Sequence, residues 1–282
     1  MTGENQALLI DARGIEVTYG GRGLFGRSEA GFKVLHGIDI AIRRGETVGI
    51  VGESGSGKST LGRALLRLVP VSAGTIAFDG QPITDLSAAR MRPLRRRMQM
   101  IFQDPMASLN PRHTIGRILT APLLLHGVVA DRAGAERAAL AMLERVSLPA
   151  AVLGRSPHEL SGGQRQRIGI ARAALLKPDF VLADEIVSGL DVSTQAMALN
   201  LLKDLSREMG LAMAFISHDL SVIRAVCDRV YVLRAGRIVE QGSCAEVFAR
   251  PRSDYTRQLL DAIPLPEIDP DWLGDRPMQP AA

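Results

Sequence analysis

The sequence predicts an α/β fold. We expect a parallel sheet covered by helices, preceded by a small antiparallel β subdomain and interrupted by an inserted α-helical subdomain. Three observations carry this prediction. Strand-like runs follow one another early in the chain, which favours antiparallel pairing. Later strand-like runs alternate with helical patterns, which is typical of a parallel sheet with helices on its faces. From residue 104 to about residue 160 the strand signal disappears and helical patterns dominate.

Strands are expected where short β-branched or other apolar runs stand between turn residues. These runs are 14–19, 32–42, 46–52, 74–80, 98–103, 179–184, 212–218, 229–236 and 237–242. Helices are expected where apolar residues recur every three or four positions, over 57–69, 133–146, 162–177 and 193–209. After Gly242 we expect two short helices at most, then a proline-rich and acidic tail, 264–282, without fixed structure.

Length and composition allow one large domain with a sizeable core, because 282 residues include 46% hydrophobic ones. We see no apolar run long enough to cross a bilayer and no secretory signal in "MTGENQALLIDARG". Cys227 and Cys244 are too few for a disulfide framework, so a cytosolic chain with reduced thiols is expected. Cys227 follows a helix-like run and is expected to be packed.

The charge pattern is weakly basic, with a formal net charge of +4. The densest basic run is "RMRPLRRRMQM", residues 90–100. A nucleic-acid site would need aromatic stacking platforms near such a run, but aromatic residues are only 4% of the chain and none is interleaved there. We therefore interpret the run as a solvated face and expect no nucleic-acid partner.

A phosphate-binding loop is predicted by "GESGSGKST", residues 52–60, which matches the P-loop spacing G-x-x-x-x-G-K-[ST]. Glycines let backbone N–H groups turn inward as an anion nest, and the following helix N-terminus adds partial positive charge. Lys58 would reach the β- and γ-phosphates, and the Ser59 hydroxyl would coordinate Mg²⁺. A flexible loop is the alternative, but a strand pattern precedes the loop and a helix pattern follows it. The core is therefore predicted to be a RecA-like P-loop NTPase, whose loop contacts are Gly52, Ser54, Gly55, Ser56, Gly57, Lys58, Ser59 and Thr60.

Two carboxylates follow a second apolar run, "DFVLADE", residues 179–185. The run is typical of a buried parallel strand, and we expect it to neighbour the strand before the phosphate loop. Asp184 at its end can hold Mg²⁺ through water, and Glu185 can polarise an attacking water. A surface pair of acids is the alternative, which the presence of the phosphate loop disfavours.

The stretch "ELSGGQRQRIGIARA", residues 159–173, resembles the signature motif of ATP-binding cassette (ABC) ATPases. Ser161, Gly162, Gly163 and Gln164 match the core of that motif. A hydroxyl and glycines that open a helix can hold a second set of phosphates. The resemblance implies that two cassettes pair head to tail, so that the signature motif of one closes over the ATP held by the other.

Four more residues match motifs of this family in the family's order. Tyr19 resembles the aromatic residue that stacks on adenine, and Gln103 in "IFQDP" resembles the Q-loop glutamine that senses Mg²⁺ and the γ-phosphate. Asp191 in "SGLDVS" resembles the D-loop aspartate at the dimer seam, and His218 in "FISHDL" resembles the switch histidine that contacts the γ-phosphate. Taken alone, Tyr19 would be a core or surface residue and His218 a structural one. Their place in the motif order favours the functional interpretation.

Three segments are similar to the ATPase subunits of oligopeptide, dipeptide and nickel importers. They are "IFQDPMASLNPRHTIGRIL", the insertion "GGRGLFGRSEAGFKVL" over 20–35, and the C-terminal "PRSDYTRQLLDAIP" over 251–264, which departs from the group's pattern at Ser253 and Asp254. Two cysteines exclude ligation of a four-cysteine cluster within the chain. The family usually has Pro-Thr after the catalytic glutamate, where this chain has Ile186 and Val187. Hydrolysis is still expected, with its rate left open.

The resemblance implies an ATP-hydrolysing subunit of an ABC importer of peptides or a related small solute. Its cofactors would be ATP and Mg²⁺, its catalytic residues Glu185, His218 and Lys58, and its metal-binding residues Ser59, Gln103 and Asp184. We expect a nucleotide-binding domain over 1–245, with its helical subdomain at 104–160, and an importer-type extension and tail over 246–282.

The implied partners are a second ABC ATPase subunit, paralogous or a second copy, two membrane permease subunits, and indirectly an external solute-binding protein. The chain would be peripheral on the cytoplasmic face of the inner or plasma membrane. Two alternatives stay open, an exporter cassette and a soluble ABC ATPase of DNA repair or translation. Neither the fused membrane spans of the first nor the long coiled-coil insertion or second cassette of the second is found in the sequence.

Overall fold

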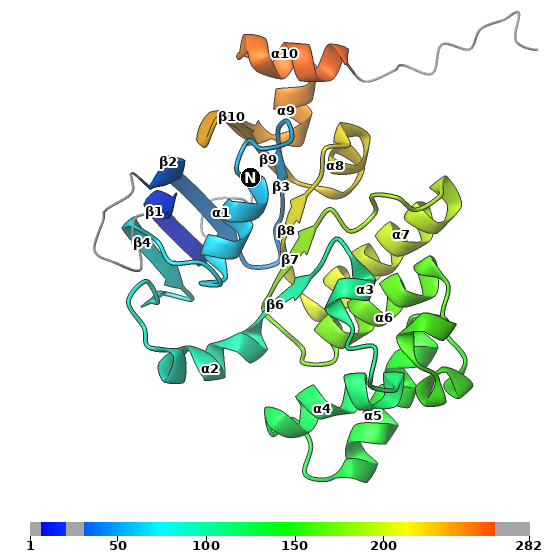
Figure 1. Cartoon of the computed structure of the whole chain (residues 1–282). Helices are drawn as coiled ribbons and strands as arrows, with labels where there is room; N and C mark the ends of the chain where they lie inside the picture. Colours follow the sequence, from blue (N-terminus) through cyan, green and yellow to red (C-terminus); the bar gives the residue numbers. More distant parts are fainter. Residues whose placement is uncertain (1–6, 21–30, 263–282) are drawn as a thin grey trace, which may run out of the picture.

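The computed structural model describes residues 7–20 and 31–262, and its centre is made of two sheets (Figure 1). One is antiparallel, in the order β2-β1-β4-β5, with β1 (Leu8–Tyr19), β2 (Phe32–Arg43), β4 (Ala73–Phe78) and β5 (Gln81–Pro82). The other has the order β10-β9-β3-β8-β7-β6, with β3 (Thr47–Val51), β6 (Met98–Ile101), β7 (Phe180–Asp184), β8 (Ala212–Ile216), β9 (Arg229–Arg234) and β10 (Arg237–Ser243). All pairings from β9 to β6 are parallel, and β10 is antiparallel to β9.

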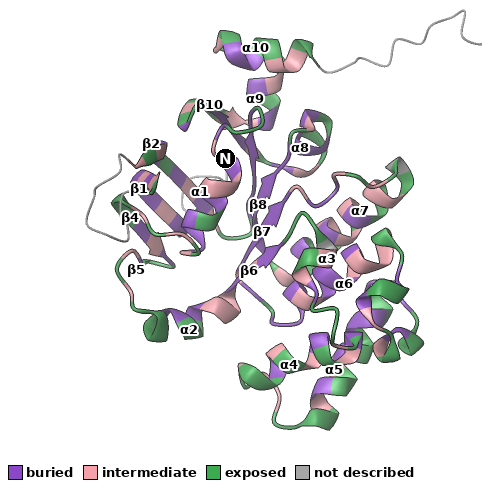
Figure 2. Cartoon of the chain, viewed as in Figure 1, coloured by how far each residue is buried: buried purple, intermediate pink, exposed green. Residues whose placement is uncertain are grey.

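The central strands of the larger sheet are buried on both faces, as Figure 2 shows. Every residue of β3, β7 and β8 is buried, which explains why these strands read as continuous apolar runs rather than alternating ones. The predicted antiparallel and parallel sheets are therefore confirmed. β1 differs from the prediction, because it begins at Leu8 rather than at residue 14. Its first half pairs with both neighbours, through Ile10 opposite Ile42 of β2 and Phe78 of β4.

Helices connect the strands of the two sheets or follow the last strand. They are α1 (Lys58–Leu65), α2 (Ala88–Arg97), α6 (Gly162–Ala174), α7 (Val192–Met209), α8 (Leu220–Val226), α9 (Cys244–Ala249) and α10 (Asp254–Asp261). α9 and α10 match the expectation of two short helices after Gly242. The remaining helices lie between β6 and α6 and form the helical subdomain: α3 (Pro105–Ser108), α4 (Ile115–Leu125), α5 (Arg132–Arg145), and the 3-10 helices η1 (Ala150–Gly154) and η2 (Pro157–Glu159).

The helices of the helical subdomain begin at their own N-cap residues and pack against one another. Thr114 caps α4 and Asp131 caps α5, each accepting a hydrogen bond from a backbone N–H inside the helix. α4 and α5 pack against each other, with residues such as Leu119 and Leu143 fully buried. Figure 1 shows both helices at the end of the molecule opposite α10. The boundaries at 104–160 and at 245 remain predictions, and a break after residue 245 would fall inside α9.

The interpretation of the basic run as a solvated face is wrong for its last arginines. Arg95 donates hydrogen bonds to the carbonyls of Leu66 and Arg67 at the C-terminal end of α1. Arg97 pairs with Asp79 and Asp179, and its guanidinium lies 5.0 Å from the centre of the Phe78 ring. The run forms α2 and ends against other elements, so these arginines complete helix ends and link the two sheets.

Both cysteines are buried and free, which confirms the packed environment predicted for Cys227. The insertion predicted over 20–35 lies mostly outside the described residues, and the tail 264–282 lies wholly outside them. Across 7–20 and 31–262, the model contains no helix with the length and hydrophobicity that a bilayer crossing requires.

Candidate nucleotide-binding site

The phosphate loop joins the end of β3 to the start of α1, as its motif predicts. Gly57 precedes α1 in a left-handed conformation, with φ 102°. The Lys58 ammonium lies inside the loop and donates to the carbonyls of Gly52 and Glu53, at 2.8 Å each. Burial lowers the pKa of Lys58, while the carboxylates of Glu185, Asp184 and Glu53 oppose that shift. The loop thus places a buried cation beside the first N–H groups of α1, which have no partner within the helix.

A buried hydroxyl in the loop supports an anion site. Ser56 is 5% exposed, and its Oγ has no hydrogen-bond partner among the described residues. Ser54 and Gly55 are exposed, whereas Ser59 and Thr60 are partly buried at the start of α1. An unsatisfied buried hydroxyl calls for a ligand, and a phosphate oxygen is the acceptor that fits beside Lys58 and a helix N-terminus.

Asp184 lies at the phosphate loop although its strand does not neighbour β3. The expectation of adjacent strands is wrong, because β8 stands between β3 and β7. α1 crosses β8 and reaches β7: a Cβ at Gly62 would lie 2.8 Å from Leu182 and 2.9 Å from Ile216. This close approach brings the Ser59 hydroxyl to Asp184, where it donates a 2.9 Å hydrogen bond to Oδ1.

The Ser59–Asp184 pair has the chemistry of a magnesium site. Burial raises the pKa of Asp184, as does the charge of Glu185, while the Ser59 hydrogen bond, Arg63 and Lys58 act in the opposite direction. A buried carboxylate and a hydroxyl are hard oxygen donors, and Mg²⁺ is bound by one or two carboxylates together with substrate phosphates. The residues present therefore fit Mg²⁺ bound together with a nucleotide.

Two polar side chains converge on one oxygen of Glu185. Gln103 Nε2 donates a 2.9 Å hydrogen bond to Glu185 Oε2, and His218 Nδ1 lies 3.9 Å from the same oxygen. The backbone of Glu185 is left-handed, with φ 49°, and is held by its N–H bond to the Ile216 carbonyl at 2.9 Å. A left-handed glutamate costs about 1–3 kcal/mol, and such strain is concentrated at functional sites.

The departure at Ile186 and Val187 leaves the loop after Glu185 well anchored. Both side chains are buried, at 1% and 4% exposure. The Gln195 amide from α7 donates to the carbonyls of Val187 and Leu190, at 3.0 and 3.1 Å. The apolar pair thus packs into the core while α7 holds the backbone.

The signature residues form a second group, away from the phosphate loop, although Gly162 shares a hollow with Gln103. Ser161 caps α6, and its hydroxyl and backbone N–H exchange hydrogen bonds with Gln164. Asp191 caps α7, where hydrogen bonds from Ser193 and Thr194 hold the pKa of its carboxyl well below its usual range. The signature and the segment around Asp191 line one hollow together. Its residues include Ser161, Gly162, Gly163, Leu190 and Asp191.

Within the described chain, the structure brings the signature residues to Asp191 and not to the phosphate loop. In Figure 1, α6 lies to the right of the larger sheet and α1 to its left. The hydroxyl and glycines of the signature therefore lie on a different part of the molecule from Lys58.

Tyr19 is the last residue of β1, an inner strand of the antiparallel sheet, and is 41% exposed. Its cross-strand partner is Phe32, which is 74% exposed. Cross-strand partners project from the same face of a sheet, so two exposed aromatic side chains lie on one face here. Phe32 was not among the site residues expected from the sequence, although its signal was an aromatic residue at the first position of the second strand.

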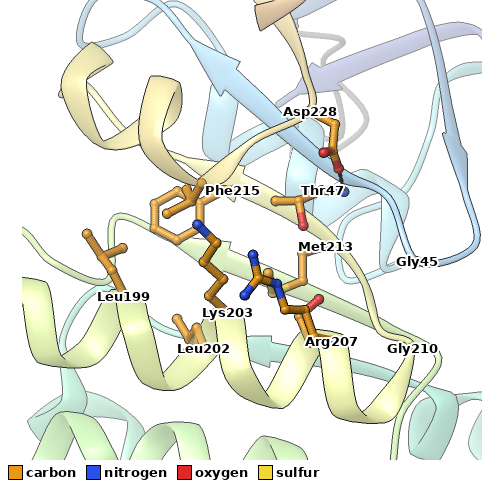
Figure 3. Close-up of a pocket in the computed structure, with 12 residues that line it drawn as sticks. Gly45, Thr47, Leu199, Leu202, Lys203, Arg207, Gly210, Met213, Phe215 and Asp228 are labelled. Atoms are coloured by element: carbon orange, nitrogen blue, oxygen red, sulfur yellow. Dashed lines mark hydrogen bonds between the residues drawn. The ribbon is translucent and has the colours of Figure 1, made fainter.

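A pocket of about 250 Å³ lies at the end of the larger sheet where β3 and β8 begin. Figure 3 shows the residues that line it. Thr47 at the start of β3 and Met213 near the start of β8 line it, and Lys203 and Arg207 extend toward it from α7. The phosphate loop follows the opposite end of β3, so this pocket is distinct from the predicted nucleotide site.

Comparison with known proteins agrees with this geometry. The family model described as ABC transporter matches residues 35–188. A putative peptide import ATP-binding protein of Brucella ovis is 54% identical over 268 residues, which are 95% of this chain and 82% of that protein. The glutathione import ATP-binding protein GsiA of Salmonella paratyphi A is 50% identical over 258 residues, 91% of this chain. The match spans only 41% of GsiA.

Solved structures confirm the predicted P-loop NTPase fold. The dimeric post-hydrolysis state of the ATP-binding cassette MJ0796, bound to ADP and Pi, matches with a TM-score of 0.74 at 29% identity and covers 83% of this chain and 98% of that one. CbiO1 of Clostridium perfringens, part of the ABC transporter complex cbiONQ, also has a TM-score of 0.74, at 28% identity, and covers 86% and 91%. The chain therefore belongs to the ABC transporter family and is an ABC-type ATPase.

Proposed function

We propose that this chain is the ATP-hydrolysing subunit of an importer of peptides or related small solutes. The observation that carries the ATPase part is the convergence of Gln103 and His218 on Glu185, next to the Ser59–Asp184 pair. The import part is supported by the names of the relatives, which are peptide and glutathione import ATP-binding proteins, and by the extent of the match to the first of them.

The separation of the two groups of site residues supports a paired arrangement. One chain presents a phosphate loop in one place and a signature motif in another, so a closed site needs a second cassette. In a head-to-tail pair, Ser161 and Gly163 of one chain close against the γ-phosphate held by Lys58 of the other, with Asp191 at the seam. The second cassette is a paralogous chain or a second copy of this one.

In the closed site, each residue has a distinct task. Tyr19 stacks on the adenine, and the loop N–H groups and Lys58 bind the β- and γ-phosphates and stabilise their charge. Glu185 accepts a proton from the attacking water, and His218 and Gln103 contact the γ-phosphate and orient that carboxylate. Ser59, Gln103 and Asp184 would hold Mg²⁺, which would supply neutralisation of charge on the phosphate oxygens.

The remaining partners follow from import. Two membrane permease subunits receive the motion of the helical subdomain, and an external solute-binding protein selects the solute. The chain then works as a peripheral subunit at the cytoplasmic face of the inner membrane. The affinity difference of ATP for the open and closed pair limits the work that one cycle delivers.

The test is ATP hydrolysis by the purified chain, alone and mixed with a paralogous cassette, for wild type, Glu185→Gln and Glu136→Gln. Glu136 is an exposed carboxylate of α5 paired with Arg132, so its variant controls for loss of a negative charge. Removal of a general base lowers the rate about 10²–10⁴-fold. We expect that loss for Glu185→Gln and a wild-type rate for Glu136→Gln. Equal rates in all three proteins would contradict the role of Glu185.

Uptake measurements separate import from the alternatives. The cassettes and permeases are reconstituted in proteoliposomes with ATP on the cassette side, and a labelled peptide is followed. ATP-dependent movement toward the cassette side supports import, and movement away from it would show an exporter. ATP hydrolysis without any association with permease subunits would favour a soluble ABC ATPase.

A further inference from the structure

We propose that the C-terminal segment, residues 251–262, positions the phosphate loop through Tyr255, and that Tyr255 thereby sets the affinity of the site for nucleotide. This inference rests on the proposed nucleotide-binding role of the loop. The sequence of this segment shows a likeness to importer subunits but indicates no task for any residue in it.

A direct hydrogen bond joins the segment to the loop. Glu53 donates its backbone N–H to the Tyr255 hydroxyl, at 3.0 Å. The carbonyl of the same residue accepts a hydrogen bond from Lys58 Nζ, at 2.8 Å. Tyr255 thus holds the N–H of Glu53 and Lys58 holds its carbonyl. A displacement of Tyr255 would therefore shift Glu53 and, through it, the Lys58 ammonium.

The tyrosine ring is itself fixed. Tyr255 is 3% exposed, and the Arg234 guanidinium lies 4.8 Å from the centre of its ring. Arg234 ends β9, and Gly236 in the following turn donates its N–H to the Ser56 carbonyl at 2.9 Å. The turn between β9 and β10 therefore holds the phosphate loop and the tyrosine ring together.

The start of α10 is anchored to the sheet by Glu240 of β10. Its carboxylate accepts hydrogen bonds from the backbone N–H groups of Arg252 and Ser253, at 2.7 and 3.0 Å. Glu240 is 8% exposed; burial alone would raise its pKa, but these hydrogen bonds hold the pKa below its ordinary value. Leu259 and Leu260 pack against the cluster of buried apolar residues that includes Tyr255 itself. Residues 251–262 are therefore packed against the rest of the fold and can hold the phosphate loop in place through Tyr255.

We expect Tyr255 to affect the affinity for nucleotide more than the rate of ATP hydrolysis. A glycine-rich loop loses conformational freedom when it closes on phosphate, and prior ordering of the loop reduces that cost. Within the described chain, the Tyr255 hydroxyl makes no hydrogen bond to Glu185, Gln103 or His218, so the hydrolytic step does not depend on it. Loss of one hydrogen bond of this kind corresponds to about a three- to tenfold loss of affinity.

The experiment compares Tyr255→Phe with Tyr231→Phe. Both replacements remove one hydroxyl from a buried tyrosine and keep its ring. The Tyr231 hydroxyl donates to the Ala41 carbonyl and accepts from Arg229, at 3.0 Å each, away from the phosphate loop. Binding of a fluorescent ATP analogue and the KM and kcat of hydrolysis are measured for wild type and both variants, and urea unfolding reports their stability.

We expect about a three- to tenfold rise in Kd and KM for Tyr255→Phe, with kcat within about twofold of wild type. For Tyr231→Phe we expect wild-type affinity together with an equal or larger loss of stability, because its hydroxyl makes more hydrogen bonds. Unchanged affinity in Tyr255→Phe, or equal losses in both variants, would overturn the inference. A wild-type chain that binds no ATP would instead overturn the proposed function. If Tyr255→Phe does not fold, Glu240→Gln tests the same anchor and must shift Kd in the same direction.

Discussion

Replacement of Gly52 by alanine should destabilise the chain far more than the same replacement at Gly55. Both glycines lie in the phosphate loop and both have positive φ, 147° and 77°. A Cβ at Gly52 would lie 2.1 Å from the carbonyl oxygen of Leu233 and 2.9 Å from Ser56 Oγ. A Cβ at Gly55 would meet nothing within 4 Å. Both variants therefore carry a cost of backbone conformation, and only Gly52→Ala adds a steric clash.

The magnitude follows from these two contributions. A non-glycine residue in the left-handed region costs about 1–2 kcal/mol, and both variants carry that cost. Gly52→Ala adds overpacking of about 1–3 kcal/mol, because the Leu233 carbonyl belongs to β9, which is paired on both sides and cannot move away. We expect a total loss of about 2–5 kcal/mol for Gly52→Ala, a large part of a typical 5–15 kcal/mol stability.

Urea unfolding without nucleotide is the appropriate assay, since both residues belong to the phosphate loop and bound nucleotide would mix affinity with stability. The free energies of unfolding of the two variants are compared with wild type at equal m-value. Equal destabilisation by the two variants would refute the reasoning, because the Leu233 carbonyl of β9 could not then lie against Gly52 as described.

Three further outcomes are expected. Asp184→Asn should stabilise the nucleotide-free chain by about 0.5–2 kcal/mol in urea unfolding while hydrolysis falls at least about 100-fold. The pKa of Asp184 in the folded chain lies above its ordinary value of 3.8, so the stability of the wild type falls as the pH rises from 3.8 through the folded pKa. The stability gained by Asp184→Asn should therefore shrink on acidification, and a gain that does not change with pH would contradict this. Arg95→Leu should lose about 1–3 kcal/mol in the same assay, because the Leu66 and Arg67 carbonyls lose their donor, and unchanged stability would show that water replaces it. Val187→Thr should lose about 1–3 kcal/mol through a buried hydroxyl, and a gain would indicate a partner for it.

Features encoded over short stretches of chain were predicted from the sequence. The phosphate loop is contiguous and its spacing is tied to a strand before it and a helix after it, so Lys58 and Ser59 could be placed at the start of α1. β7 and β8 read as buried strands because each is an unbroken apolar run. α2 was missed because its arginines dominate the pattern and only Met91 and Leu94 are buried within it.

Features that depend on contacts between distant segments were decided by the tertiary structure. From the sequence, the strand that ends at Asp184 was expected beside β3, but β8 lies between β3 and β7. Only the close packing of α1 at Gly62 brings Ser59 to Asp184. Glu53 and Tyr255 are 202 positions apart, and no local pattern predicts that one donates to the other. The separation of the signature from Lys58 is likewise set by the order in which helices pack on the sheet. By itself the sequence determined which residues can bind a nucleotide, because that chemistry resides in short motifs; the fold decided which of them meet, because strand order and helix packing arise from the whole core.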